Sequence, residues 1–417
     1  MQFLHLTKKP DEPEPDSGPM ARAIAILQSR TSSRNYVLSP KAALSKYGKF
    51  LSPFGKKEIL LYDKIYYTAE KPHYLNAPVD ALQRNIFVYK NGHYKIVLED
   101  QIAYRYYVYT LMYSGENSQV VMAADLKIMK QVALKIDRLR APLALNEARM
   151  LRMIREWDYG KDSNIIMLHN DTVFRYHPVL VFDKCQHDLK DRIRENSTGL
   201  PIQEIKKICQ PLLKALAFLR QHGVIHGDIK PENIRFDDQG KLKLSGFRYS
   251  CLENEATANR YTDLYSRAYR APEIICSGRP TFAIDIWAFG CVLGEMMLGH
   301  KMFDGFSDAD HLRRVEELLG YPPNAFFTYC ESTQVLSSPL DDPTFLKYFS
   351  GPRAVNNASF AVPQCTPSSA LEKIFSNDRA ELLPKLQHCI GWVPRLRLMP
   401  DIVPSKIIWA RVPQVLP

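Results

Sequence analysis

The hydrophobic and polar positions of this chain predict a strand-rich part followed by a larger, mainly helical part. Residues 85–98 are expected to form two short strands around Asn91-Gly92, a dipeptide that favours the tight turn of a β-hairpin. Strands and one helix are expected over residues 104–182, and helices dominate the pattern beyond Asp183. The pattern therefore predicts an α+β protein with a small β-rich lobe and a large helical lobe.

The flanking segments are less regular. Residues 8–19 are rich in proline and charge and are expected to be disordered, with a short helix near residues 20–28. Ser39-Pro40 predicts the start of another helix, because serine suits the N-cap and proline the first turn. Residues 326–378 contain clusters of serine, proline and asparagine and are expected to form long loops.

The composition is that of a globular protein with a sizeable core, since 46% of the 417 residues are hydrophobic and 24% are charged. No apolar run reaches the roughly 18 residues that span a bilayer, and residues 1–15 lack the apolar core of a secretory signal. The eight cysteines contain no CxxC pair, which favours reduced thiols over a disulfide framework or a zinc site. A cytoplasmic or nuclear location is expected.

The chain is basic, with a net charge of +10. Such a surface could attract acidic proteins, RNA or anionic lipid. No RNP-like motif or dense basic block accompanies the charge, so a solvated basic face is favoured over nucleic-acid binding. The basic residues recur in two stretches, at positions 41, 46, 49, 56, 57 and 64 and at positions 138, 140, 149, 152 and 155.

The candidate chemistry is concentrated in His226-Gly-Asp-Ile-Lys-Pro-Glu-Asn233. Asp228 could accept a proton from a hydroxyl, Lys230 could neutralise a phosphate, and Asn233 could offer an amide oxygen to Mg²⁺. These types at this spacing suit phosphoryl transfer, although a polar loop between two strands would contain the same residues.

Four further motifs in a fixed order weaken that simpler interpretation. Val132-Ala-Leu-Lys135-Ile predicts a strand with one ammonium group, and Glu147 lies on a helical run where it could pair with Lys135. Ala271-Pro-Glu273 and Asp285-Ile-Trp287 follow.

These motifs resemble those of the eukaryotic protein kinases, and more narrowly the dual-specificity tyrosine-regulated kinases (DYRK, class 2) of the CMGC group. Tyr261-Thr-Asp-Leu-Tyr-Ser-Arg-Ala-Tyr-Arg-Ala-Pro-Glu273 is similar to the family's activation segment. The resemblance implies a two-lobed protein-kinase fold with an N-terminal accessory region. It divides the chain into a mostly disordered tail (1–36), the accessory region (37–100), the N-lobe (101–182) and the C-lobe (183–412) with a CMGC-type insert around 326–378.

The resemblance also implies an ATP site that includes Lys135. Phe182 would be its gatekeeper, and Asp188 would lie near the ribose. Asp183 and Cys185 would be its hinge residues. Simple core or connector packing explains the hinge residues equally well. Two strand residues, Val120 and Ala133, would line the adenine pocket.

The loop expected over the phosphates departs from the family. Only Gly115 of its three glycines remains, and Tyr113 and Ser118 replace the other two. A tyrosine at the first position is expected to stiffen or lift the loop, because glycine lets backbone amides approach phosphate closely.

A second departure lies at Gly246-Phe-Arg248, where the family has Asp-Phe-Gly. Without that carboxylate a cation would be held by Asn233 alone, so ATP and Mg²⁺ are both expected to bind weakly. Phe247 is expected to keep its packing against His226. Restoring an aspartate at position 246 is expected to raise any transfer rate by orders of magnitude.

Asp263 occupies the position of the family's autophosphorylated tyrosine and could supply part of a phosphate's charge to Arg267 and Arg270. An exposed aspartate without a partner is an equally good explanation. Glu273 and Arg397 are expected to form a buried structural ion pair.

The chain is therefore expected to be a pseudokinase that acts as a scaffold or allosteric partner of other proteins. The alternative is an active Ser/Thr or dual-specificity kinase that transfers the ATP γ-phosphate to protein hydroxyls with Asp228, Lys230, Lys135, Glu147 and a single metal on Asn233. A third possibility is a sensor that binds ATP without transferring phosphate.

Overall fold

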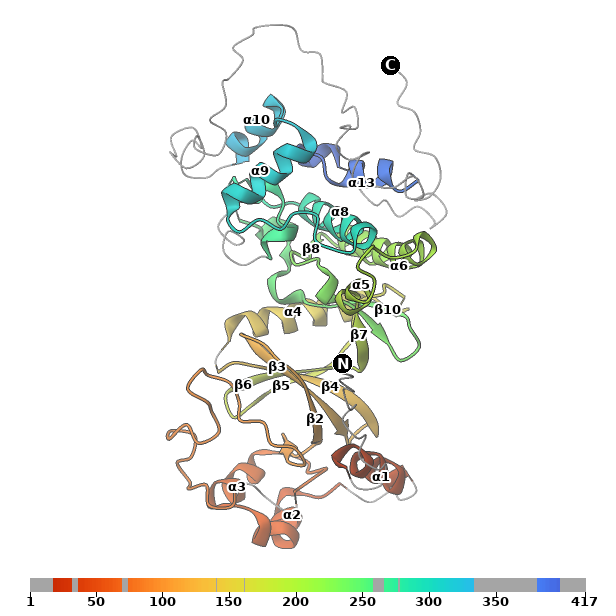
Figure 1. Cartoon of the computed structure of the whole chain (residues 1–417). Helices are drawn as coiled ribbons and strands as arrows, with labels where there is room; N and C mark the ends of the chain where they lie inside the picture. Colours follow the sequence, from red (N-terminus) through yellow and green to blue (C-terminus); the bar gives the residue numbers. More distant parts are fainter. Residues whose placement is uncertain are drawn as a thin grey trace, which may run out of the picture. The chain divides into compact units, whose positions relative to one another are not determined.

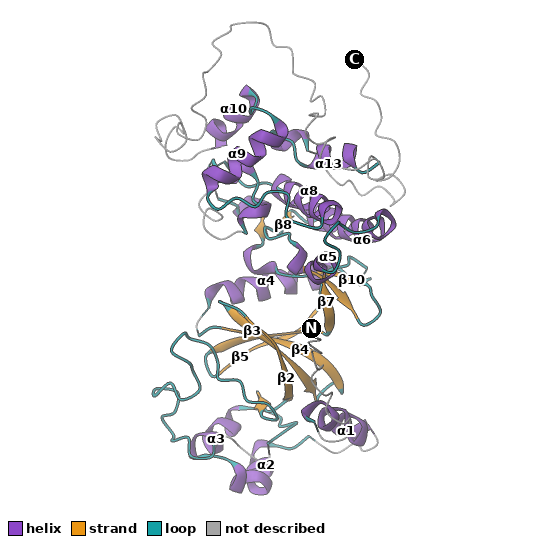
Figure 2. Cartoon of the chain, in the orientation of Figure 1, coloured by secondary structure: helices purple, strands orange, loops and turns teal. Residues whose placement is uncertain are grey.

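The computed structural model describes residues 18–31, 37–69, 74–139, 141–160, 162–257, 266–276, 278–333 and 381–397. The chain forms two compact units, here called the amino-terminal unit (Met1–Ala148 and Met167–Lys184) and the carboxyl-terminal unit (Arg149–Ile166 and Cys185–Pro417). Most of the strands lie in the first unit and most of the helices in the second (Figure 2).

The amino-terminal unit is built on a six-stranded antiparallel sheet with the order β1-β2-β3-β4-β6-β5 (Figure 1). The strands are β1 (Gln101–Ile102), β2 (Tyr106–Ser114), β3 (Ser118–Asp125), β4 (Lys130–Asp137), β5 (Leu168–Phe174) and β6 (His177–Asp183). Helix α4 (Pro142–Trp157) starts in this unit and ends in the other.

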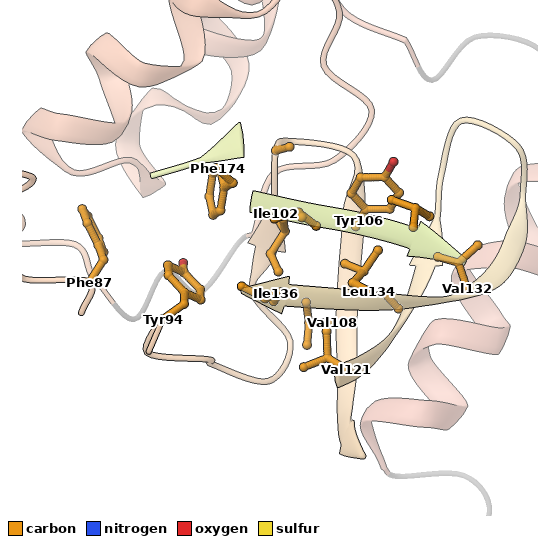
Figure 3. Packing of buried hydrophobic residues seen from close by; sticks show 14 of the residues in the cluster. Phe87, Tyr94, Ile102, Tyr106, Val108, Val121, Val132, Leu134, Ile136 and Phe174 are labelled. Atoms are coloured by element: carbon orange, nitrogen blue, oxygen red, sulfur yellow. The ribbon is translucent and has the colours of Figure 1, made fainter. Parts of the chain in front are cut away.

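One face of this sheet packs against the accessory region. Val132, Leu134 and Ile136 alternate along β4 and are all buried, as the period of two in a strand requires. They belong to a core cluster with Phe87 and Tyr94, which come from the segment before the sheet (Figure 3). Burial of a large apolar side chain contributes about 1.5–3 kcal/mol, so this contact stabilises both the sheet and the accessory region.

Helix α1 (Pro19–Thr31) packs on the other face of the sheet, against β2 and β3. Ala23, Ile26 and Leu27 follow the helical spacing and pack in a cluster with Tyr107 and Met122 of the sheet. The predicted helix near residues 20–28 is thus confirmed, and it is three residues longer at its carboxyl end. The segment before it, predicted to be disordered, lies outside the described residues.

The accessory region contains α2 (Pro40–Tyr47), α3 (Pro53–Glu58) and the helical turns η1 (Gly48–Phe50) and η2 (Ile59–Leu61). Ser39 Oγ accepts a hydrogen bond from Ala42 N at 3.2 Å, so the predicted helix start is confirmed. The predicted turn at Asn91-Gly92 is present, with φ of +85° at Gly92. The two predicted strands around it are not formed, since residues 85–98 contain only an isolated bridge between Val88 and Tyr94.

The carboxyl-terminal unit is mainly helical. Its helices are α5 (Leu189–Arg194), α6 (Ile202–Gln221), α7 (Pro272–Ile275), α8 (Ala283–Leu298), α9 (Asp308–Leu319), α10 (Asn324–Thr333) and α13 (Leu383–Cys389). Five short strands form two small sheets: β7 (Cys185–Asp188), β9 (Ile234–Asp237) and β10 (Leu242–Leu244) in one, and β8 (Val224–Ile225) and β11 (Cys251–Leu252) in the other.

The apolar helix α8 lies at the centre of this unit and is buried along almost its whole length. Beside it, Arg397 makes two bonds of 2.6 Å to Glu273, and neither side chain is exposed. The predicted buried ion pair is therefore confirmed. The prediction of irregular loops from position 326 is wrong for residues 326–333, because Phe326 and Cys330 are buried one helical turn apart on α10. Residues 334–380 lie outside the described residues.

Candidate functional site

The loop after β8 is held by a buried carboxylate. Asp285 Oδ2 accepts a hydrogen bond from His226 N at 2.7 Å and Oδ1 accepts one from Gly227 N at 2.8 Å. Burial raises the pKa of Asp285 to about 7, and the two backbone donors oppose that rise. Gly227 has φ of +81°, a conformation that favours glycine, so the turn before Asp228 depends on that residue.

His226 connects this loop to the segment around Gly246. Its Nε2 donates to Ser245 O at 3.0 Å, its Nδ1 accepts from Asp228 N at 3.1 Å, and its ring lies 4.5 Å from that of Phe247. Burial lowers the pKa of His226 to about 3, so the ring is neutral at physiological pH. The predicted packing of Phe247 on His226 is confirmed.

Asp228 is almost fully buried and its carboxylate is already engaged. Oδ2 accepts hydrogen bonds from Lys230 Nζ at 2.9 Å and Asn233 Nδ2 at 2.8 Å, and Nδ2 also donates to Asp228 O at 2.7 Å. Burial raises the pKa of Asp228, while Lys230 opposes the rise. The three predicted catalytic-loop residues therefore form one connected group, and Lys230 Nζ also lies 3.2 Å from Ser266 Oγ.

Gly246 lies directly against Asn233. A Cβ atom at position 246 would come within 2.5 Å of the amide nitrogen and oxygen of Asn233, and Gly246 has φ of +89°. The amide of Asn233 therefore occupies the space in which a side chain at position 246 would begin. Sequence reasoning found the missing carboxylate but could not find this contact.

The groups around Asn233 that could hold Mg²⁺ are engaged with one another. Mg²⁺ prefers carboxylate and water oxygens in near-octahedral geometry. The one carboxylate of this group, on Asp228, is paired with Lys230, and Asn233 directs its amide nitrogen to Asp228. Within the described parts of the chain, no three histidine, cysteine, aspartate or glutamate side chains are placed to hold a metal ion.

The amino-terminal unit carries the predicted ammonium–carboxylate pair. Lys135 Nζ on β4 lies 2.6 Å from Glu147 Oε2 on α4, and Glu147 is buried. Cross-strand pairing puts Val120 beside Lys135 and Met122 beside Ala133, so the predicted adenine-lining residues share one face of the sheet with the ammonium group. The role of these residues toward a phosphate group stays a prediction.

The turn between β2 and β3, expected over the phosphates, is closed by its own contacts. Gly115 N donates to Ser118 O at 3.0 Å, and the ring of Tyr113 fills the space beside the Cα atom of Gly115. Two carbonyls of the turn accept hydrogen bonds from outside it, from His93 Nε2 at 3.1 Å and Arg138 N at 3.1 Å. A backbone amide that is bonded within the turn is not available to a phosphate oxygen, which agrees with the expected stiffening.

The remaining predicted nucleotide residues have structural partners. Phe182 is buried opposite Ala133, and Asp183 Oδ1 lies 2.6 Å from His169 Nε2. Asp188 accepts a hydrogen bond from Asp191 N at 3.1 Å and so caps α5, while burial raises its pKa. Cys185 lies half-buried at the start of β7. Their roles toward a nucleotide stay predictions.

The predicted activation-segment arginines both bind a residue that the sequence analysis missed. Arg267 Nε lies 2.9 Å and Arg270 Nη1 lies 3.0 Å from Asp308 Oδ1 at the start of α9. Asp263 lies outside the described residues, so its pairing with these arginines stays a prediction. No signal in the sequence links Asp308 to the two arginines, since its pattern is only that of a helix amino terminus.

Comparisons with known proteins agree with this fold and these motifs. The family model for the protein kinase domain matches residues 106–338. The chain is 33% identical over 318 residues to a putative dual specificity tyrosine-phosphorylation-regulated kinase 3 homolog of Drosophila melanogaster, covering 74% of this chain and 38% of that protein. It is 32% identical over 320 residues to the human dual specificity tyrosine-phosphorylation-regulated kinase 3, covering 75% and 54%. A crystal structure of a kinase domain matches with a TM-score of 0.60 at 24% identity and covers 74% of this chain and 96% of that chain.

The chain belongs to the protein kinase family and has its two-lobed α+β fold. Within that family its relatives are the DYRK kinases of the CMGC group, as the motifs indicate. Protein kinases generally use ATP and Mg²⁺ and act on proteins. The chain spans about half the length of the curated relatives it matches. None of the helices in the described part has the length and apolarity to cross a membrane.

Proposed function

We propose that this chain is a catalytically impaired DYRK-like kinase, that is, a pseudokinase that binds other proteins as their scaffold or allosteric partner. The observation that supports this function is the contact between Gly246 and Asn233. Where the family has a carboxylate that binds metal, this chain has no side chain, and the neighbouring amide fills the vacated space.

The electrostatics favour the same conclusion. Phosphoryl transfer depends on positioning and on neutralisation of charge at the transferred group. Removal of one neutral hydrogen-bond donor from an oxyanion hole typically lowers kcat by about 10²–10³-fold. Loss of a charged metal ligand is expected to cost at least as much. Since kinases typically turn over at about 1–100 s⁻¹, transfer by this chain is expected to be slow or undetectable.

The second candidate is a working Ser/Thr or dual-specificity kinase. It is favoured by the intact pair of Lys135 with Glu147 at 2.6 Å and by the retention of Asp228, Lys230 and Asn233 in one hydrogen-bonded group. In that case Asp228 would orient the substrate hydroxyl and Lys135 would place the phosphates. A single cation on Asn233 would then require the amide to turn away from Asp228.

A combined binding and transfer experiment on the full chain separates these functions. Thermal unfolding is measured with ATP alone, with ATP and Mg²⁺, and with ATP and a chelator, and transfer is followed as radiolabel on a basic peptide. The pseudokinase that acts as a scaffold predicts no shift with ATP under any of these conditions and no label. A shift that is indifferent to Mg²⁺, without label, identifies a nucleotide sensor.

The matched variants are Asp228→Asn and Asp304→Asn, because Asp304 is an exposed aspartate of the same unit outside the catalytic loop. Brisk Mg²⁺-dependent labelling that Asp228→Asn abolishes and Asp304→Asn retains would establish the working kinase and overturn the proposal.

A further inference from the structure

The accessory region carries a stretch of chain that is rich in exposed lysines and poor in exposed acids. Six lysines between positions 41 and 64 are exposed, and within the described part of the chain none of them has a carboxylate at ion-pair distance. The same stretch holds only two acids: Glu58 is buried and bonded to Arg175, and Asp63 is exposed. The six are Lys41, Lys46, Lys49, Lys56, Lys57 and Lys64.

The packing of this region turns the lysines outward. Ala43 of α2, Ile59 of η2 and Ile65 form a small core with Tyr104, so the apolar sides of these elements face one another. Helices α2 and α3 both contact η2. The charged sides are therefore left on the outside of one compact substructure.

Two leucines of the same stretch are also exposed. Leu60 and Leu61, at the end of η2, have 50% and 83% of their surface exposed. In the sequence, only the buried residues Glu58 and Ile59 separate these leucines from Lys56 and Lys57. We call the six lysines and these two leucines the lysine–leucine face.

We propose that the lysine–leucine face binds the surface of an anionic lipid bilayer. Peripheral attachment to such a surface combines basic residues, which attract the lipid headgroups, with a few apolar side chains that enter the headgroup boundary. The face supplies both, and its charge comes from point-like ammonium groups that suit a diffuse array of headgroups. An arginine-rich site, with forked donors, would indicate recognition of one fixed phosphate or carboxylate.

Nucleic acid is a poorer occupant of this face. Binding of single strands relies on aromatic rings on which bases stack. The two rings closest to these lysines in sequence, Tyr47 and Phe50, are half-buried, and the ammonium groups of Lys46 and Lys49 lie 5.1 Å and 4.8 Å from their centroids. Their faces are thus already occupied by cations from the same chain.

The expected effects follow from the chemistry of each group. Every lysine near an anionic bilayer contributes about fivefold to the partition constant. Lys56→Gln with Lys57→Gln should therefore weaken binding about 25-fold, and Leu61→Ser, which removes one apolar side chain, by about tenfold. Salt should reduce the attraction because it screens charges at the surface.

The test is co-sedimentation of the full chain with vesicles of phosphatidylcholine alone and of phosphatidylcholine with phosphatidylserine, at low and high salt. The matched control is Lys127→Gln with Lys130→Gln, which removes the same charge from two other exposed lysines of the same unit. Thermal unfolding of each variant verifies that it folds. The proposal predicts salt-sensitive binding to the anionic vesicles only, weakened by the Lys56/Lys57 variant and by Leu61→Ser but not by the control.

Three results would overturn it. They are equal binding to neutral and anionic vesicles, equal losses in the Lys56/Lys57 variant and its control, and no binding at low salt. Binding of a homopolymeric RNA that displaces the vesicles and is indifferent to Leu61→Ser would assign the face to nucleic acid instead.

Discussion

The contact between Gly246 and Asn233 makes a quantitative prediction about stability. Gly246→Ala adds a Cβ atom in a left-handed backbone conformation, which costs about 1–2 kcal/mol for an L-residue. The same Cβ atom must displace the amide of Asn233 and so break its bond to the Asp228 carboxylate. A hydrogen bond to a charged group contributes about 1.5–3 kcal/mol, so the substitution should lower the free energy of unfolding by roughly 2.5–5 kcal/mol.

Gly240→Ala is the matched control for this substitution. Gly240 has φ of +75°, but a Cβ atom there would meet nothing within 4 Å. It therefore carries the backbone strain without the collision and should cost only about 1–2 kcal/mol. The difference between the two alanine variants isolates the contact with Asn233.

A double-mutant cycle with Asn233→Ala completes the argument. Once the Asn233 side chain is shortened, Gly246→Ala should cost no more than Gly240→Ala, which gives a coupling of about 1.5–3 kcal/mol. The assay is urea unfolding followed by tryptophan fluorescence. It reports on the relevant part of the chain, since Trp157, Trp287 and Trp392 all belong to the carboxyl-terminal unit and the amino-terminal unit contains no tryptophan. Equal costs of the two alanine variants, or an additive cycle, would refute the reasoning.

The cost of the added Cβ atom must also be considered when the effect of Gly246→Asp on transfer is interpreted. Gly246→Asp carries the same Cβ atom, so the carboxylate that is expected to raise transfer arrives together with the loss of the Asn233 contact. Gly246→Asp must therefore be compared with Gly246→Ala. Any gain in transfer or in Mg²⁺-dependent stabilisation over Gly246→Ala is due to the carboxylate alone.

Three further predictions concern the ion pairs and a buried histidine. Arg397→Gln should lower the free energy of unfolding by about 3–5 kcal/mol, because it leaves Glu273 buried without its partner. Arg194→Gln, at an exposed pair, should lower it by less than about 1 kcal/mol. Similar losses for the two variants in urea unfolding would contradict this prediction. Glu58→Gln removes the charge and one of the two oxygens that Arg175 bonds at 2.9 Å, and it should speed hydrogen exchange in α2 and α3. Asp80→Asn, at an exposed pair with Arg84, should not. Burial lowers the pKa of His311 to about 4 from its ordinary value of 6.5, so the folded state takes up fewer protons than the unfolded state between these values and loses stability as the pH falls through them. His311→Asn should therefore reduce the slope of unfolding free energy against pH in that window by up to about 1.4 kcal/mol per pH unit, and an unchanged slope would contradict the assignment.

The sequence predicted those parts of the fold that rest on local pattern. Ser39-Pro40, the turn at Asn91-Gly92 and the helix near residues 20–28 were all found, because caps, turn residues and helical spacing act over a few positions. The pair of Lys135 with Glu147 was found because the order of motifs fixes both residues. Its role toward ATP stays a prediction.

The parts that the sequence did not predict are set by tertiary contacts. Residues 326–333 were grouped with the serine-, proline- and asparagine-rich stretch that follows them, yet Phe326 packs against Trp392 at 5.1 Å between ring centroids and the segment is helical. Arg267 and Arg270 bind Asp308, some forty residues away, which no local pattern could indicate. Propensity acts weakly here, because burial of one aromatic side chain outweighs a few tenths of a kcal/mol per residue.

The site itself combines both kinds of information. In the sequence, Gly246 stands where the family has an aspartate, and the other residues of the catalytic loop are present. In the structure the Asn233 amide occupies the space beside Gly246 and donates to Asp228, which is also paired with Lys230. Retention of Asp228, Lys230 and Asn233 is therefore no sign of catalysis by itself, because together they form a satisfied polar network whose loss would leave a buried carboxylate unpaired. A network of this kind would be kept for folding in a chain that transfers no phosphate.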